Sequence, residues 1–465
     1  MTTLAAPHAR SIPLSWAGHA KAMILLGLPL VGAQLAQVSI NVTNTVIVGQ
    51  LGTVELAAAV LATQTFYLFW MFGSGFAYAV MPMAASANGR ADIRGVRRSV
   101  RMGLWVVCAY AAITMIPLWF TEAILVALRQ DPGVSAMAGD YARVLQWSML
   151  PYLSTFVLRS YLSALERPRA VLVITVLGAL ANAGLNYVLV FGHFGAPALG
   201  LAGSGIASVS TAILTVALLV AFTLRDGALQ RYDIYVRFWR PDWSAFLEVV
   251  RLGWPIGATI LAEVGLFTAA SVMMGWIGTV ELAAHGIALQ IASVSFMVPL
   301  GLASAATVRV GTAYGRDDRL GVGRAARTAL VVATAISTGA ALLFWTIPVP
   351  LISLYLDLRA PDAERVLQAA VPLLAIAAAF QIVDSIQVTS SGILRGLKDT
   401  RTPMIFAVLS YWAVGMPVAY TLAFVFEWGG AGVWWGLAIG LGVAAVLMTG
   451  RFFVKETHGR TVIDA

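Results

Sequence analysis

Two carboxylates lie inside long apolar stretches of the sequence. Glu263 is near the middle of residues 253–278, and Asp384 lies within residues 366–392, whereas the other acidic residues lie in loops, at termini or at the ends of apolar runs. A carboxylate at membrane depth costs free energy unless it faces a cavity, a partner or a proton. Removal from water favours the protonated form, and an approaching cation favours the ionised form. Such residues can therefore exchange a proton for a cation.

The apolar stretches that carry these carboxylates are long enough to cross a bilayer. Hydrophobic residues make up 59% of the 465 positions and charged residues 11%, and the mean hydropathy is +0.83. This composition indicates an integral membrane protein rather than several soluble domains. The runs lack the alternation of a barrel, so we predict an all-α fold. Its twelve transmembrane helices are expected over residues 22–48, 57–82, 101–121, 137–160, 170–191, 199–224, 251–277, 282–308, 328–352, 366–392, 403–426 and 432–454.

The basic residues indicate how the chain is oriented. Of thirty Lys and Arg residues, twenty-six lie in the termini and in the loops after the second, fourth, sixth, eighth and tenth predicted spans. By the positive-inside rule, both termini are expected in the cytoplasm. The net charge of +8 comes from these scattered loops, so we expect a lipid bilayer as a partner and no nucleic acid.

The two halves of the chain repeat one another. The segment GTVELAA at residues 52–58 recurs at residues 278–284, an offset of 278 − 52 = 226. The match continues at Gly27 and Gly253, Gly75 and Gly301, and Gly89 and Gly315. A shift of six spans keeps both halves in the same orientation, so we predict two six-helix lobes related by an axis along the membrane normal, with the substrate site between them. The lobes are expected at residues 1–224 and 251–465, joined by a cytoplasmic loop at residues 225–250.

Three further segments are distinctive. They are residues 254–267 (WPIGATILAEVGLF), residues 283–285 (AAH), and residues 381–384 (QIVD) followed by 392–400 (GILRGLKDT). With the two six-helix lobes, they resemble the multidrug and toxic compound extrusion (MATE) family, most closely its NorM-type bacterial branch. The resemblance implies an antiporter of the bacterial inner membrane that exports organic cations in exchange for H⁺ or Na⁺. By position, Glu263 and Asp384 match the two acidic residues that such transporters use for the coupling cation and for cationic drugs, so a Na⁺ site at this pair is one alternative.

Helical spacing places polar residues beside both carboxylates. Gln381 and Gln387 share a stripe with Asp384, and Thr259 and Phe267 share a face with Glu263. These six residues are the predicted site for the coupling cation and the substrate. Aromatic and Met residues could form its adaptable wall. The candidates for that wall are Phe267, Met273, Phe296, Met297 and Tyr411.

The N-terminal lobe departs from the family pattern. Members of this branch typically carry an Asp in the first helix, where this sequence has Asn44. Asn182 and Asn186 follow at a spacing that puts both on one helical face. An amide can form hydrogen bonds but cannot titrate. We therefore expect coupling to run through Glu263 and Asp384, with the three asparagines supplying structural or weaker polar contacts.

Other interpretations remain open at this stage. Either acid could be structural, hydrogen-bonded to a neighbouring helix. A lipid-linked oligosaccharide flippase of the same superfamily would carry basic residues in its cavity, and no span shows a Lys or Arg at mid-membrane. An intramembrane enzyme would need a nucleophile and base pair or metal ligands within the spans, which are not visible. The sequence lacks a phosphate-binding loop, so we expect no cofactor besides the coupling ion, and we expect a monomer.

Overall fold

The computed structural model describes residues 15–357, 359 and 362–461, and this part of the chain is helical throughout its regular structure. The first half comprises α1 (Trp16–Gly49), α2 (Thr53–Gly89), α3 (Ile93–Trp119), α4 (Thr121–Ala127), α5 (Pro132–Leu145), η1 (Gln146–Ser148), α6 (Met149–Ala164), α7 (Pro168–Phe191), η2 (His193–Gly195), α8 (Gly200–Arg225) and α9 (Gly227–Gln230). The second half comprises α10 (Trp243–Ile277), α11 (Thr279–Gly315), α12 (Arg319–Thr346), α13 (Pro348–Ser353), α14 (Ala363–Gly396), α15 (Arg401–Val408), η3 (Leu409–Gly415), α16 (Met416–Tyr420), η4 (Thr421–Val425) and α17 (Gly429–Thr461).

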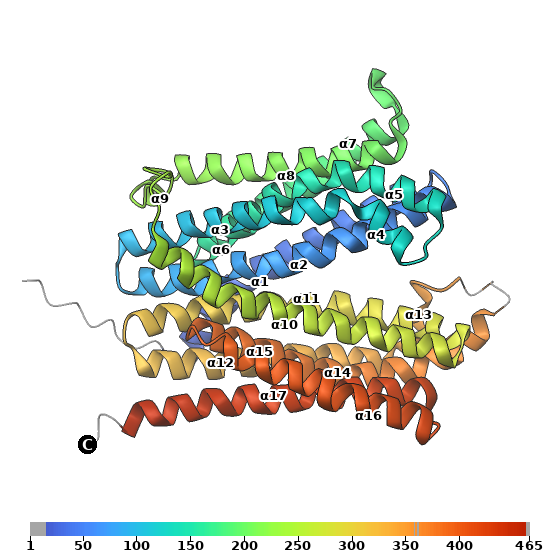
Figure 1. The fold of residues 1–465 in the computed structure, drawn as a ribbon. Coiled ribbons are helices and arrows are strands. Elements are labelled where there is room, and N and C mark those ends of the chain that lie inside the picture. The colour runs from blue at the N-terminus through green and yellow to red at the C-terminus, as the bar shows by residue number, and fades with distance from the viewer. Residues whose placement is uncertain (1–14, 358, 360–361, 462–465) are drawn as a thin grey trace, which may run out of the picture.

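The sequence repeat is visible in the helix boundaries. Helices α2 and α11 each contain 37 residues and begin directly after Gly52 and Gly278, which are 226 positions apart. The helices that follow, α3 and α12, begin at Ile93 and Arg319, again 226 positions apart. The long helices run side by side between two ends of the molecule (Figure 1). The predicted twelve-helix membrane fold is confirmed.

Two of the predicted spans differ from simple α-helices. Within the described residues, eleven helical segments are long and apolar enough to cross a bilayer. The remaining crossing, predicted over 137–160, is divided into α5 and α6 by the 3₁₀ turn η1. Pro151 follows this turn closely, and proline removes a backbone hydrogen bond from the preceding turn of a helix. The crossing predicted over 403–426 contains two π-helical segments, η3 and η4.

One end of the bundle carries the arginine-rich loops, and we call it the basic end. There the connection between the halves is docked on α3 rather than projecting away (Figure 1). Arg97 donates a hydrogen bond to the carbonyl oxygen of Tyr232 at 2.7 Å, and Arg98 forms an ion pair with Asp242. Asp242 also caps α10 by accepting from the backbone N–H of Ala245. Helix α10 therefore begins at Trp243, eight residues before the predicted start of its span.

Two hydrophobic cores hold the bundle together, and α1 and α10 each contribute to the core of the opposite half. The basic-end part of α1 packs into the core built mainly by α11, α14 and α17, and that of α10 packs into the core built mainly by α2, α3 and α6. The exchanged residues are Met23, Leu26 and Leu30 of α1 and, 226 positions later, Val249, Leu252 and Ile256 of α10. The exchange is thus symmetric and ties the halves together near the basic end.

Glycines allow the two halves to approach closely in the basic half of the bundle. A Cβ added at Gly75 of α2 would meet the backbone nitrogen of Gly257 in α10. The residue 226 positions later is Gly301 of α11, and a Cβ added there would meet the backbone nitrogen of Val31 in α1. Small residues permit such close packing between transmembrane helices.

The basic ends of α2 and α11 also meet. A Cβ at Gly89 would contact the carbonyl oxygen of Thr312, and a Cβ at Gly315 would contact that of Ser86. Since Ser86 and Thr312, like the two glycines, are 226 positions apart, the contact is symmetric about an axis between the halves. These glycine contacts together, which we call the basic-end seal, hold the backbones of the two halves close to each other at this end.

The seal makes a prediction for Gly75→Ala. The added methyl group collides with backbone atoms of α10, so we expect the halves to separate at the basic end. Spin labels on Cys residues introduced at Arg94 and Leu320, both exposed, in a Cys108→Ser background should then report a longer distance by double electron–electron resonance. Gly286→Ala, where a Cβ meets nothing within 4 Å, is the matched control. Equal distances in both variants would show that the glycine contacts do not set the closure.

Candidate functional site

A central cavity of about 320 Å³ lies between the two halves. Its walls come from α1, α2 and α6 of the first half and from α10, α11, α14, the turn after α14 and the start of α15 of the second. The polar residues that line it include Gln34, Gln37, Asn41, Thr259, Glu263 and Gln387. The cavity therefore lies where the repeat predicts a site, and it brings together three of the six predicted site residues.

Glu263 projects into this cavity from the middle of α10. One turn earlier, Thr259 donates its hydroxyl proton to the carbonyl oxygen of Pro255 at 2.8 Å. Phe296 and Met297 of α11 also line the cavity, as predicted for an apolar and adaptable wall.

Asp384 lies behind the cavity wall rather than on it. Its side chain is 3% exposed, and its Oδ1 has no hydrogen-bond partner among the described residues. It is nevertheless close enough to Glu263 for the two carboxylates to interact electrostatically. The hydroxyl of Tyr411 interacts electrostatically with both carboxylates. Two like charges placed together in a medium of low polarity hold a proton between them more readily than two separate carboxylates do.

The other predicted neighbours of Asp384 divide between wall and core. Gln387 lines the cavity, whereas Gln381 is 1% exposed and lies outside the cavity wall. Phe267 packs against Phe380 with its ring centroid 6.0 Å away, also behind the wall. Met273 and Tyr411 are buried in the core of the second half. The expectation that Phe267, Met273 and Tyr411 line the cavity is therefore wrong for this conformation, because they pack into the core of the second half.

Basic residues reach the cavity, contrary to the expectation from the sequence. Arg395 lines the cavity toward its basic end, and it interacts electrostatically with Glu263. Arg159 of α6 is buried beside the cavity and donates to Gln34 Oε1 at 3.0 Å. Both lie at the basic ends of their helices, so their charges fall within reach of the cavity without appearing at mid-span in the sequence.

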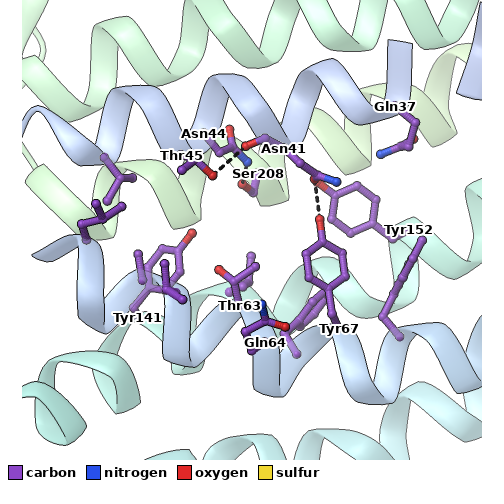
Figure 2. Close-up of a pocket in the computed structure, with 17 residues that line it drawn as sticks. Gln37, Asn41, Asn44, Thr45, Thr63, Gln64, Tyr67, Tyr141, Tyr152 and Ser208 are labelled. Atoms are coloured by element: carbon purple, nitrogen blue, oxygen red, sulfur yellow. Dashed lines mark hydrogen bonds between the residues drawn. The ribbon is translucent and has the colours of Figure 1, made fainter. Parts of the chain in front are cut away.

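A second pocket of about 220 Å³ adjoins the cavity in the first half of the chain (Figure 2). Gln37, Asn41 and Trp70 line both spaces, so the two spaces are adjacent. This pocket extends past Asn44 and Thr63 to Val48 and Leu56, near the ends of α1 and α2 that lie opposite the basic end. Together the two spaces are lined from Thr400 and Pro403 at the basic end to Val48 and Leu56 near the opposite end.

The predicted asparagine cluster lies at the wall of this pocket. Asn44 donates to Ser208 Oγ at 3.4 Å, and Asn186 Nδ2 donates to Asn44 Oδ1 at 3.0 Å. Asn182 is fully buried one turn from Asn186, with neither side-chain polar atom hydrogen-bonded among the described residues. The three asparagines are therefore neighbours, and the described lining of the pocket contains no ionisable carboxyl group.

Sequence reasoning missed the aromatic part of this pocket. Figure 2 shows Tyr67, Tyr141 and Tyr152 facing it, with the hydroxyl of Tyr67 hydrogen-bonded to Asn41. A signal was available on α1, where polar side chains recur on one face of an otherwise apolar helix. Those residues are Gln34, Gln37, Asn41 and Asn44.

Comparison with known sequences gives consistent matches. Residues 29–188 and 255–421 match the sequence model of a family described as MatE. The chain is 52% identical to a "Probable multidrug resistance protein NorM" of Rhizobium meliloti, over 94% of both chains, and 49% identical to one of Agrobacterium fabrum with the same coverage. A protein of the same name from Pseudomonas aeruginosa is 40% identical, over 94% of this chain and 90% of that one.

Solved structures share the fold at lower identity. A "MATE in complex with MaL6" superimposes with a TM-score of 0.87 at 19% identity, covering 95% of this chain and 97% of the other. The eukaryotic MATE transporter AtDTX14 superimposes with a TM-score of 0.84 at 20% identity, covering 96% of this chain and 98% of the other. At this identity, the likeness establishes the fold alone.

The cavity predicts which positions a polar reagent can reach. Cysteines in place of Asn41 and Thr259 line the open space, so in a Cys108→Ser background we expect a charged maleimide to label both in the purified protein. A cysteine replacing Ala378 of α14, which is 0% exposed, should stay unlabelled and serves as the control. Equal labelling at all three positions would contradict the description of the cavity.

Proposed function

Because this chain belongs to the MatE family, we propose that it is a secondary transporter that exports organic cations in exchange for H⁺ or Na⁺. The observation that carries the proposal is the placement of Glu263 on the wall of the inter-lobe cavity, with the carboxyl group of Asp384 buried behind that wall. The proposal gives each carboxylate a distinct place: Glu263 meets the solute, and Asp384 shares its proton.

The chemistry of exchange follows from the buried pair. With no cation present, a proton shared by the two carboxylates removes the cost of holding two negative charges in a poorly polar site. An organic cation entering the cavity stabilises the ionised form of Glu263 and so favours release of that proton. Proton and cation therefore compete for the same negative charge, which is the requirement for antiport.

The cavity wall suits cations that differ in shape. Trp70, Tyr78 and Phe296 offer aromatic faces, and Met297 offers a flexible and polarisable side chain. Aromatic rings attract cations through their electron-rich faces, and methionine adapts to irregular shapes. We therefore propose a substrate class of lipophilic organic cations rather than one specific metabolite.

Alternating access would use the basic-end seal. In the present conformation the halves are packed at the basic end, and the polar space extends toward the opposite end. If the basic end faces the cytoplasm, as the positive-inside rule predicts, this is an outward-facing state of a bacterial inner-membrane protein. Each elementary charge that crosses the membrane gains about 2.3 kcal/mol per 100 mV, so inward movement of the coupling ion can drive export.

The polar pocket of the N-terminal lobe bears on the coupling ion. Asn44, Asn182 and Asn186 can accept or donate hydrogen bonds but cannot carry a negative charge. Among the described residues, no group of three or more His, Cys, Asp or Glu side chains is arranged to hold a metal ion. A Na⁺ site would thus rest on Glu263, Asp384 and neutral oxygens, and we favour H⁺ as the ion that exchanges at this pair.

A second candidate function is translocation of a lipid-linked oligosaccharide. The observation that favours it is Arg395, which lines the cavity and could hold a phosphate group. Against it, the carboxylate of Glu263 lies in the same cavity and repels anions. Membership of the family disfavours an enzyme. Ser271 Oγ and His285 Nε2 do lie 3.0 Å apart within a membrane-spanning part of the chain. The Ser271 hydroxyl, however, already donates its proton to the carbonyl oxygen of Phe267.

The proposal predicts the behaviour of Glu263→Gln and Asp384→Asn. Both substitutions keep size and hydrogen bonding but remove the titratable group, so each should reduce gradient-driven ethidium transport to background. The measurement is ethidium fluorescence in everted vesicles with either a pH gradient or a Na⁺ gradient imposed. The gradient that drives transport identifies the coupling ion.

Glu364→Gln provides the matched control for these variants. Glu364 lies on α14, as Asp384 does, but in its exposed first turn, so its removal should leave transport unchanged. Vesicle content of each variant is checked by immunoblot. If both cavity variants transport ethidium at the wild-type rate, the exchange does not use this pair and the N-terminal pocket becomes the site to test.

A further inference from the structure

A lateral pocket at the basic end combines arginines with lipid-facing apolar side chains. It has a volume of about 640 Å³ and lies among α1, the turn between α6 and α7, α8 and α11. Its charged lining comprises Arg167, Arg169, Arg309 and Glu166, while Leu25 and Val173 form part of its apolar wall. The pocket is separate from the central cavity, with which it shares no lining residue.

The arginines of this pocket carry positive charge that the protein itself only partly neutralises. Arg167 pairs with Asp226 at 3.6 Å, and Arg309 interacts with the single acidic lining residue, Glu166. Among the described residues, no carboxylate oxygen lies within 4.0 Å of Arg169 or of Arg309. Arg309 Nη2 instead contacts His19 Nδ1 at 3.2 Å. The pocket is therefore complementary to an anion.

The apolar side of the pocket faces the surface of the bundle. Leu25 is 54% exposed and Val173 is 56% exposed, and both lie on helices that cross the membrane. Leu28 and Leu180 continue this exposed apolar surface along α1 and α7. A ligand that extends from the arginines along these helices would thus meet apolar surface at the depth of lipid acyl chains. A soluble anion would leave that surface unused.

The repeat supplies an internal comparison. The equivalent pocket in the second half lies between α10 and the turn that joins α14 to α15. Arg251 and Leu252 line it. The residues 226 positions earlier, Leu25 and Leu26, line the first pocket. Its remaining lining residues are Lys398, Asp399, Thr400 and Arg401. It therefore has basic residues but almost no apolar wall.

Two charged residues of this second pocket are paired within the protein, whereas no carboxylate oxygen among the described residues lies within 4.0 Å of Arg251 or Arg401. Lys398 pairs with Glu248 at 2.7 Å, and Asp399 pairs with Lys455 at 2.6 Å and Arg451 at 3.4 Å. Burial alone would raise the pKa of Asp399, but the hydrogen bond and charge of Lys455 bring it below its usual value, so Asp399 stays ionised. Both related pockets thus carry arginines without a carboxylate partner, and the difference between them is the apolar groove that adjoins the arginines of the first.

We propose that the pocket lined by Arg167, Arg169 and Arg309 binds the phosphodiester of an anionic phospholipid, with its acyl chains lying along α1 and α7. Arginine suits this ligand because its planar guanidinium can donate two hydrogen bonds to one phosphate group. Basic pockets between transmembrane helices at the cytoplasmic surface are typical sites for anionic headgroups.

A bound lipid would also connect parts of the molecule that belong to different halves. Arg309 comes from α11 in the second half, whereas Arg167 and Arg169 come from the start of α7 in the first. The phosphate would bridge them next to the basic-end seal. Under the alternating access proposed above, such a lipid favours the conformation that is closed at the basic end.

Native mass spectrometry of the purified full-length protein tests the site without measuring transport. Dioleoylphosphatidylglycerol is titrated into detergent micelles, with dioleoylphosphatidylethanolamine as the zwitterionic comparison and inorganic phosphate as the soluble competitor. We expect tighter binding of the anionic lipid, no displacement by phosphate, and affinity about fivefold weaker in Arg169→Gln and in Arg309→Gln.

Two further variants keep this test decisive. Arg401→Gln removes an arginine from the related pocket and should leave affinity for the anionic lipid unchanged. Arg309→Lys retains the charge and should bind the anionic lipid more tightly than Arg309→Gln does. Size-exclusion chromatography checks that Arg309→Gln is well folded. Wild-type affinity in both pocket variants, equal binding of the zwitterionic lipid, or displacement of the lipid by phosphate would each overturn the proposal.

Discussion

The cost of holding negative charge away from water is the constraint on which this structure depends. Glu263 and Asp384 are the two acids placed inside the membrane-spanning helices, and they interact with each other. Two charges in such surroundings are stable only with a proton, a cation or a positively charged neighbour. Arg395 lies in the same cavity but forms no ion pair with Glu263 within 4.0 Å in the described structure. The pair is thus left dependent on what enters the cavity.

The rest of the fold decides which side can supply that proton or cation. Glycine contacts between α2 and α10, between α1 and α11, and between α2 and α11 bring backbones together at the basic end. Larger side chains there would hold the halves apart. The exchanged ends of α1 and α10 fasten the same region. Packing brings the backbones of the two halves together at the basic end, and we propose that the polar space toward the other end gives access to Glu263.

Much of this arrangement could be predicted from the sequence, for reasons that differ between residues. The offset of 226 positions predicted the pairing of the halves, and apolar length predicted the crossings. Glu263 was predicted to be a site residue because a single acid in an apolar helix costs free energy unless it faces a cavity, a partner or a proton. The break at Gln146 and the π segments were missed, since tertiary packing sets them rather than apolar length. Arg395 was missed because it lies beyond its predicted span, yet its helix continues to Gly396. Phe267 was placed on the cavity wall by helical spacing and Tyr411 by residue type, and neither shows what the surrounding helices cover.

Proton release on cation binding tests the central claim most directly. Tetraphenylphosphonium is added to the purified protein in weakly buffered, Na⁺-free detergent solution, binding is followed by calorimetry, and the pH is followed with an indicator dye. The carboxylate-pair account predicts that binding acidifies the solution, and that Glu263→Gln binds without doing so or does not bind. Binding of the cation to the wild type with no release of protons would contradict the account.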